Sequence, residues 1–480
     1  MLLELSGWEG FWDEAIVIFF QSLSIGILII GFAQALIYFL QLPLAALGLF
    51  KKTARDQESN ARWLESSEIV LPVSIIVPAY NEEVTIVKSV QTSLALRHPA
   101  YEVIVANDGS IDGTLEVLKK EFQLVPSKRT YEYLLPCQEI IQVYRSLVHP
   151  NLVVIDKKNG GKADALNASI NLSRYPVFCT LDADSILDPK SLLKATKPFI
   201  EDPEGVIVVG GTIQIFNGNQ FENGIIKRIK LPRNPLALFQ VNEYIRAFLI
   251  GRLSLSNIGI LTIISGAFAL IQKEAAVAVG GFDTNTIGED LSLIVKLYRR
   301  RMENQQKIKV EFIPETVCWT EAPETFKVLK SQRIRWQQGM LETFFRNKIM
   351  LFNPQYKRIG TIAFPMLLIL DIFGPLAELA GYILMPGVYA AGLISMNLLL
   401  TFYALFIGMG VFISIVSLLL QEFSGLRKFN SINRLLILLA CACLENVGYR
   451  QLNGFYRIIA WWRFIRKKQV WGDMKRKGTK

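Results

Sequence analysis

The sequence predicts an α/β domain with a mostly parallel sheet, joined to a bundle of membrane-spanning helices. Two observations carry this prediction. Of the 480 residues, 51% are hydrophobic, which exceeds the usual share in a soluble protein, so we expect part of the surface to face lipid. The longest apolar blocks lie at the two ends of the chain, whereas short β-branched runs alternate with helical patterns across residues 51–350.

The N-terminal region, residues 1–50, is predicted to be a transmembrane anchor. Its apolar block at 15–40 is longer than the roughly 20 residues that cross a bilayer. A cleavable signal peptide fits poorly, because acidic residues such as Glu9 and Asp13 precede the block and the block is too long. Basic residues follow at positions 51, 52 and 55, and the positive-inside rule places the region after the anchor in the cytosol.

The central region, residues 51–350, is predicted to be the α/β domain. A β-branched run begins at Val73, stops near Pro78 and leads into a helical pattern. Further strand patterns follow at residues 101–106, 152–156 and 177–181. Alternation of this kind is typical of a parallel sheet covered on both faces. The stretch 121–150 carries no motif, and we expect a longer helix and a loop there.

Paired carboxylates follow the last of these strands. Ligands of parallel sheets bind beyond the carboxyl ends of the strands, and Asp182 and Asp184 lie there, two residues apart. Both side chains point the same way if the chain stays extended. Together they can hold Mg²⁺ or Mn²⁺ with the oxygens of a diphosphate, and the metal would neutralise a nucleoside diphosphate leaving group. Taken alone, an Asp-x-Asp pair fits a solvated turn at least as well.

Two other loops at the same edge carry groups suited to a nucleotide. Asp108, in NDGS at 107–110, can accept hydrogen bonds from a uracil or from ribose hydroxyls, although Asp-Gly is also an ordinary turn signal. GGKADAL, at 160–166, is a glycine loop that enters a helix, so backbone N–H groups and Lys162 can meet phosphate there. An ordinary loop and helix start explains that segment about equally well.

The net charge of +10 does not indicate nucleic acid as a partner. Much of the basic excess lies beside the membrane segments, where anionic lipid headgroups are the simpler partner. The chain has only two histidines, His98 and His149, and neither lies near another candidate ligand in the sequence. We therefore expect carboxylates, and not histidines, to carry the chemistry.

With these residues together, the chain resembles the family 2 glycosyltransferases, in the membrane-integrated branch that contains hyaluronan synthase, bacterial cellulose synthase and bacterial poly-N-acetylglucosamine synthase. The resemblance runs from about Val73 to Gly339. It rests on eight motifs in order: IIVPAYNEE at 75–83, NDGS at 107–110, GGKADALN at 160–167, DADS at 182–185, SGAF at 265–268, GGFD at 280–283, GED at 288–290 and QRIRW at 332–336. The resemblance implies the GT-A fold, an inverting reaction, a UDP-sugar donor and Mg²⁺ or Mn²⁺.

The resemblance also implies roles for individual residues. Asp108 would bind the uridine, Asp182 and Asp184 the diphosphate and metal, and Asp290 would be the general base. The local pattern agrees for Asp290, because GED precedes a helix, whose dipole favours an ionised carboxylate able to take a proton from the acceptor hydroxyl. Glu289 and Asp290 also fit a simple acidic helix cap. Many relatives have DDG and TED where this chain has Asn107-Asp108 and GED, so the neighbours of the ligand and base differ.

QRIRW lies within residues 325–346, whose apolar and basic residues recur at helical spacing, as expected of a helix in the membrane interface. Trp336 offers a flat face to an acceptor sugar, and Arg335 or Arg333 can pair with the diphosphate. We assign Gln332 and Glu289 to the same acceptor and diphosphate region. Simple lipid anchoring by Trp and Arg is the alternative. In the family, this motif marks enzymes with an acceptor site at a pore mouth, which favours polymer synthesis.

Residues 351–465 are predicted to be a C-terminal transmembrane bundle, with apolar blocks near 360–385, 388–420 and 432–464. Asp371 and Glu378 are costly in lipid, so we expect them to face protein or a water-filled path. The second block is long enough for one tilted span or two short ones. For the third we favour a hairpin of short spans over one span plus an interfacial helix. The basic tail, 466–480, is expected in the cytosol.

The sequence therefore predicts an inverting transferase that extends a β-linked polysaccharide at the cytoplasmic face of the cell membrane, with UDP-N-acetylglucosamine or UDP-glucose as donor. Passage of the product through the bundle and accessory polysaccharide-export subunits would fit this function. A second hypothesis is a transferase with a lipid acceptor. A third is a sensor or transporter that binds a nucleotide-sugar without turnover, against which the presence of Asp182, Asp184, Asp290 and Arg335 argues.

Overall fold

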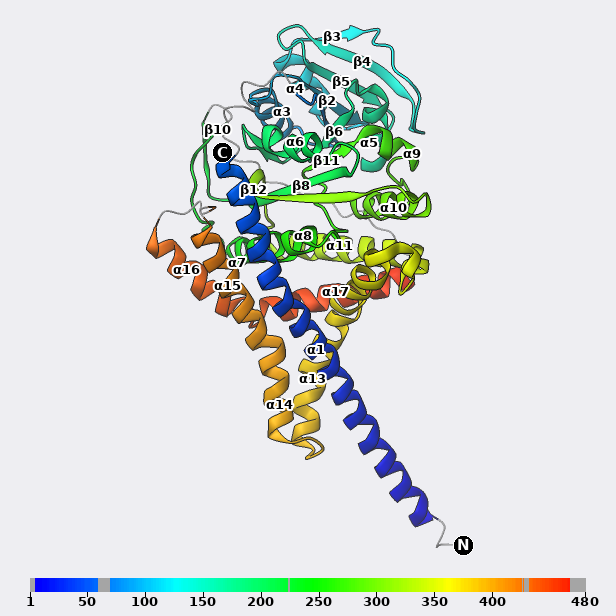
Figure 1. Ribbon diagram of the computed structural model, residues 1–480, viewed down its shortest axis with the longest axis vertical. Helices are drawn as coiled ribbons and strands as arrows, with labels where there is room; N and C mark the ends of the chain where they lie inside the picture. Colours follow the sequence, from blue (N-terminus) through cyan, green and yellow to red (C-terminus); the bar gives the residue numbers. More distant parts are fainter. Residues whose placement is uncertain (1–4, 59–69, 223–224, 425, 427–430, 467–480) are drawn as a thin grey trace.

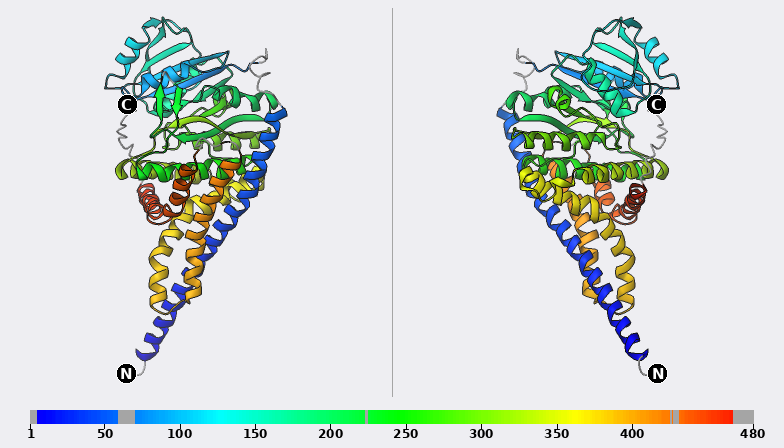
Figure 2. Two further views of the ribbon diagram at one scale, coloured as in Figure 1. Left: turned by 90° about the vertical axis from the view of Figure 1, so that its left-hand side faces the viewer. Right: turned by 90° about the vertical axis from the view of Figure 1, so that its right-hand side faces the viewer.

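The structure is a computed structural model, and it describes residues 5–58, 70–222, 225–424, 426 and 431–466. An α/β domain lies above a layer of helices that run across its lower side, and long helices extend from this layer (Figure 1). The long helices taper away from the domain towards the N-terminus in both side views (Figure 2). Of the predicted basic tail, all but residue 466 lies outside the described residues.

The centre of the domain is a parallel sheet formed by the predicted strands. β1 (Val73–Ala79) pairs in parallel with β2 (Tyr101–Asp108) and β6 (Val177–Thr180), and β2 pairs in parallel with β5 (Leu152–Lys157). Nearly every residue of these strands is buried, as their continuous apolar runs require. The surrounding helices are α3 (Ile86–Leu94), α4 (Thr114–Glu121), α5 (Lys162–Leu172) and α6 (Ser191–Glu201).

Both flanks of this parallel centre contain antiparallel pairs, although β8 and β12 pair in parallel, so the complete sheet is mixed. Its order is β3-β4-β5-β2-β1-β6-β11-β8-β12-β7. One flank is made by β3 (Leu124–Ser127) and β4 (Ile140–Ser146); the other by β11 (Ala269–Gln272), β8 (Val206–Ile215), β12 (Lys309–Thr320) and β7 (Ile186–Leu187). The expected longer helix over 121–150 was wrong. IIQVYRS in this stretch forms β4, which pairs with β5, as its β-branched residues favour.

The remaining elements of the domain are short, except for helix α10 (Glu289–Glu303), which carries residues of the site. They are the two-stranded sheet β9 (Gln220–Glu222) and β10 (Ile225–Arg228), helix α9 (Lys273–Ala278) and helix α10. Helix α10 begins directly after Gly288, as the GED motif predicted. Its first two residues, Glu289 and Asp290, thereby lie at the positive end of the helix dipole.

A layer of helices separates the domain from the long helices (Figure 1). It contains α7 (Pro235–Ile245), the π-helical segment η1 (Arg246–Arg252), α8 (Leu253–Asn257), α11 (Phe326–Arg346) and α17 (Tyr449–Ile465), with short turns η2 (Lys348–Met350) and η3 (Pro354–Tyr356). Helix α11 begins after Thr325, whose hydroxyl accepts a hydrogen bond from the Val328 N–H at 3.5 Å. It covers nearly the whole predicted interfacial segment, and α17 packs against it.

Among the described residues, three helical stretches are long and apolar enough to cross a membrane: 14–51 within α1 (Leu5–Glu58), 359–390 and 396–423. A bent pair of helices, 432–444 with 449–465, meets the same criterion only when the two are taken together. The second consists of η4 (Ile359–Ala363), α12 (Phe364–Leu367), η5 (Leu368–Phe373) and α13 (Gly374–Ala390). The third consists of α14 (Met396–Tyr403), η6 (Ala404–Gly408) and α15 (Met409–Phe423). Most of the predicted block at 388–420 therefore lies in one such stretch and not in two.

The last apolar block differs from the favoured prediction of a hairpin. Helix α16 (Ile432–Leu444) and α17 meet at a bend of 54°, so α17 does not fold back along α16. Arginine and polar residues along α17 explain the difference, because they suit a helix that lies across the domain's lower side better than one that crosses lipid. Arg450 of α17 pairs with Glu378 of α13 at 2.8 Å, which confirms that Glu378 faces protein.

Candidate functional site

Three chain segments bring charged side chains together at one edge of the sheet. Lys162 is the first residue of α5 and follows Gly161, whose φ of 87° favours glycine. The Lys162 ammonium lies 2.8 Å from the Asp182 carboxylate, just beyond β6, and 3.0 Å from the Glu289 carboxylate, at the start of α10. Lys162 thus bridges two of the predicted carboxylates that the sequence places 107 residues apart, from 182 to 289.

Asp290 lies beside this bridge. Its Oδ2 atom accepts a hydrogen bond from the Gly266 N–H at 2.9 Å, and its Oδ1 atom accepts one from the Leu291 N–H at 2.7 Å. A Cβ atom on Gly266 would lie 3.1 Å from both Asp290 Oδ2 and Lys162 Nζ. The SGAF motif therefore supplies a glycine where the backbone must approach the two charged groups. This role of Gly266 was not predicted from the sequence.

The surroundings change the acid strength of Asp290. Burial first, and then the Glu289 carboxylate, raise the pKa of its carboxyl, Lys162 opposes the shift, and the net value is about 6. For Lys162, burial lowers the pKa of the ammonium, but the carboxylates of Asp182, Glu289 and Asp290 together raise it above its ordinary value. At neutral pH Asp290 is consequently an ionised carboxylate with a raised proton affinity, and Lys162 is charged, a combination suited to general-base catalysis next to an anion.

Asp182 and Asp184 occupy the turn after β6, and both are partly exposed. Among the described residues, no group of three or more His, Cys, Asp or Glu side chains is arranged to hold a metal ion. Two partly exposed carboxylates nevertheless fit Mg²⁺ or Mn²⁺, which accept oxygen ligands and take the rest from phosphates and water. A metal at this turn would depend on the donor diphosphate to complete its coordination.

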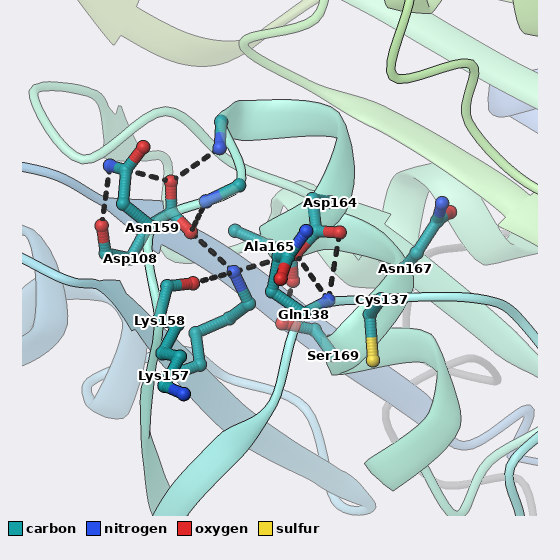
Figure 3. Close-up of polar contacts among 12 residues, drawn as sticks. Asp108, Cys137, Gln138, Lys157, Lys158, Asn159, Asp164, Ala165, Asn167 and Ser169 are labelled. Atoms are coloured by element: carbon teal, nitrogen blue, oxygen red, sulfur yellow. Dashed lines mark hydrogen bonds and ion pairs between the residues drawn. The ribbon is translucent and has the colours of Figure 1, made fainter.

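Asp108 is buried in an internal network (Figure 3). Its carboxylate accepts hydrogen bonds from the Gly160 N–H at 3.0 Å and the Gly161 N–H at 2.7 Å, and it forms an ion pair with Lys157. The Lys157 side chain is fully buried and also pairs with Asp164 at 2.6 Å. Asp108 therefore holds the glycine loop that presents Lys162, and its contact with a uridine stays a prediction.

Lys157 was missed in the sequence because DKKNGGK has the appearance of a solvated charged loop. Only the pairing of β5 with β2, which sets Lys157 opposite Asp108, places its side chain inside the domain. The network also includes the Asp164 carboxylate, which accepts hydrogen bonds from the Gln138 N–H at 3.1 and 3.0 Å (Figure 3). This contact ties the segment before β4 to the glycine loop.

The QRIRW residues lie on α11 with different surroundings. Arg333 forms two hydrogen bonds with the Glu243 carboxylate of α7, at 2.5 and 2.8 Å, and its guanidinium lies 4.6 Å from the Trp336 ring centroid. The Arg333 guanidinium is thus engaged by Glu243, and the diphosphate contact of Arg335 or Arg333 stays a prediction. Gln332 is buried, and Trp336 is 44% exposed. Their roles towards an acceptor stay predictions.

Comparisons with known proteins bear on the family of the chain. Two family models match the chain, "Glycosyl transferase family group 2" over residues 177–413 and "Glycosyl transferase family 2" over residues 74–133. The poly-β-1,6-N-acetyl-D-glucosamine synthase of Staphylococcus aureus strain COL is 30% identical over 278 residues, which cover 57% of this chain and 56% of that protein. The synthase of the same name from Staphylococcus epidermidis is 29% identical over 307 residues, covering 62% of this chain and 63% of that one.

The matched region spans little more than half the length of these curated relatives. Among solved structures, the mannosyltransferase PcManGT from Pyrobaculum calidifontis, in complex with GDP-Man and Mn²⁺, superposes with a TM-score of 0.52 at 18% identity. That alignment covers 94% of this chain and 100% of the other. At this identity the likeness bears on the fold alone, and it agrees with the GT-A fold.

Proposed function

Because the chain belongs to the family 2 glycosyltransferases, of the polysaccharide synthase branch, we propose that it transfers N-acetylglucosamine from UDP-N-acetylglucosamine onto a growing β-linked polysaccharide. The proposal rests on one observation: the Lys162 ammonium pairs with the carboxylates of Asp182 and Glu289, and the Asp290 carboxylate lies beside this pair. The synthase names of the two staphylococcal relatives support N-acetylglucosamine over glucose.

In the proposed reaction, Lys162 binds the donor diphosphate. Its ammonium is already surrounded by three carboxylates, so an incoming phosphate group competes for a cation that is held in place and fully charged. Asp182 and Asp184 would hold Mg²⁺ or Mn²⁺, and the metal, when bound, neutralises the charge that develops on the leaving diphosphate. When Lys162 pairs with the phosphate, its positive charge no longer lowers the pKa of Asp290 to the same extent, and the proton affinity of Asp290 rises.

Asp290 acts as the general base. The acceptor hydroxyl gives its proton to the Asp290 carboxylate as its oxygen bonds to the anomeric carbon, and the bond from that carbon to the diphosphate oxygen breaks. Attack from the face opposite the leaving group inverts the anomeric configuration. The hydrogen bond from Gly266 fixes one carboxylate oxygen, which orients the proton-accepting group.

The membrane context fits a polymer-forming enzyme that works at a bilayer. In the part of the chain that the structure describes, three helical stretches are long and apolar enough to span, and α11 lies between them and the domain (Figure 1). Trp336 of α11 is exposed. We propose that the domain faces the cytosol, that Trp336 stacks on the acceptor sugar, and that the product leaves through the bundle.

The test is UDP release by the purified full-length protein across a panel of nucleotide sugars with Mg²⁺ or Mn²⁺. We expect turnover with UDP-N-acetylglucosamine and a radiolabelled product of high molecular mass. A product that consists only of a short glycolipid would replace the polymer proposal with the lipid-acceptor hypothesis. Binding of UDP-sugar with no UDP release under any condition would instead support a non-catalytic sensor.

A further inference from the structure

Helix α11 contacts the turn that precedes the GED motif through one of its faces. The contacts come from Gly339, Glu342 and Arg346, which are three and four residues apart and therefore lie on the same side of the helix. This face is distinct from the Arg333 contact with α7. Each of the three residues meets a different part of residues 285–288, so the turn is held along its length.

Glu342 makes the central contact. Its side chain is only 8% exposed, and its Oε2 atom accepts two hydrogen bonds, from the Thr286 hydroxyl at 2.8 Å and from the Ile287 N–H at 3.1 Å. The Gly288 N–H in turn donates to the Thr286 hydroxyl oxygen at 3.4 Å. One carboxylate oxygen thereby fixes three consecutive residues immediately before Glu289 and Asp290.

The two outer contacts support the same turn. A Cβ atom on Gly288 would lie 2.8 Å from the Gly339 Cα atom, so the two backbones touch because both residues are glycine. At the other end, the Arg346 guanidinium donates to the Asn285 carbonyl oxygen at 2.5 Å. The close approach gives a physical reason for glycine at the position where many relatives have threonine.

We propose that Glu342 is a positioning residue for the transfer reaction: from α11 it holds the turn at 286–288 so that Asp290 stays in contact with Gly266. The inference rests on the proposed function, in which Asp290 takes the acceptor proton. Trp336 lies on the same helix, so α11 carries both the proposed acceptor contact and the support of the base. Displacement of α11 would move the two together.

The experiment compares substitutions that separate the accepting oxygen from the bulk of the side chain. Glu342→Met keeps length and removes the acceptor, whereas Glu342→Gln keeps an amide oxygen that can accept both hydrogen bonds. Thr286→Val removes the hydroxyl from the other side. Thr343→Val is the matched control, because the adjacent Thr343 is 2% exposed and its hydroxyl has no hydrogen-bond partner within the described residues.

Two measurements are made on each full-length protein: kcat and KM for UDP-N-acetylglucosamine, and hydrogen exchange of the peptide that contains residues 285–291. We expect Glu342→Met to lower kcat roughly 10- to 100-fold, since a misplacement near 1 Å at a reacting group costs about that much. KM for the donor should stay within about twofold, because the proposed donor contacts, Lys162 and Asp182, come from α5 and from the turn after β6 and not from the turn at 286–288. Exchange at Ile287 should be faster. Thr286→Val should give a smaller change of the same kind, and Glu342→Gln should retain most of kcat.

Several results would overturn the inference. Unchanged kcat in Glu342→Met, unchanged exchange at Ile287, or an equal loss in Thr343→Val would each remove the positioning role. A rise in donor KM that matches the loss of kcat would indicate general damage to the domain. Failure of the wild-type protein to release UDP from any donor would refute the proposed function itself, and this outcome is recognised without any variant.

Discussion

The replacement Asp290→Asn tests the assignment of the general base most sharply. Asparagine has the same shape, and its amide oxygen can still accept the hydrogen bond from Gly266. The variant therefore loses proton affinity and the acceptor of the Leu291 N–H, with little change in volume. A general base contributes roughly 10²- to 10⁴-fold to a rate. We expect kcat to fall within that range while the affinity for UDP-sugar is retained.

The pH profile of the wild-type protein carries the same test further. A base works in its deprotonated form, so kcat/KM should rise with pH and level off above the pKa of Asp290, which is about 6. With that value, activity at pH 5 should be about tenfold lower than at pH 7. This rise of activity with pH, the acidic limb of the profile, should be absent from the residual activity of Asp290→Asn.

The assay is UDP release at saturating acceptor, with donor affinity measured separately by calorimetry. Glu303→Gln is the control, because Glu303 ends the same helix and forms an exposed ion pair with Arg299 at 3.0 Å. We expect it to keep wild-type activity. An Asp290→Asn protein that transfers sugar as fast as the wild type would refute the base assignment.

Other substitutions probe the remaining parts of the site. Lys162→Met should raise the donor KM at least tenfold. It should also move the acidic limb of the pH profile to higher pH, because the positive charge of Lys162 no longer lowers the pKa of Asp290. An unchanged KM and an unchanged pH profile would contradict the role of the Lys162 bridge. Gly266→Ala should lower kcat, because its Cβ atom would lie 3.1 Å from both Asp290 and Lys162, and a neutral result would show that the site relaxes freely. Asp108→Asn should destabilise the domain by about 3 kcal/mol in thermal unfolding, since it removes one partner of buried Lys157; unfolding at the wild-type temperature would argue against the network. Chelation with EDTA should abolish UDP release and added Mg²⁺ or Mn²⁺ should restore it, whereas full activity in EDTA would exclude the metal role.

The sequence was sufficient for the parallel centre of the fold. Strands β1, β2, β5 and β6 were recognisable because strands buried on both faces have continuous apolar sequences. Polar residues follow each of them in the sequence. The flanking strands were not recognisable in this way. In β3 and β4, only Val143 and Ser146 are buried, so the apolar pattern is weak and the segment was taken for a helix and loop.

The candidate site was only partly predictable for a related reason. Motifs identified Lys162, Asp182 and Asp290, but which groups contact one another depends on how α5 and α10 approach β6, and this is a property of packing. Buried pairs such as Lys157 with Asp108 follow from strand register, and a charged residue in a polar loop gives no local sign of it. The contact of Glu342 with the turn before GED joins residues 286 and 342, and nothing in either segment alone indicates it.

A structure of the full-length protein with UDP and Mn²⁺ is the most direct test of the account. We expect the diphosphate next to Lys162, the metal on Asp182 and Asp184, and the Asp290 carboxylate open towards the space left for the donor sugar and the acceptor hydroxyl. A nucleotide bound elsewhere, with Lys162 still held between Asp182 and Glu289, would contradict the claim that these residues form one transfer site.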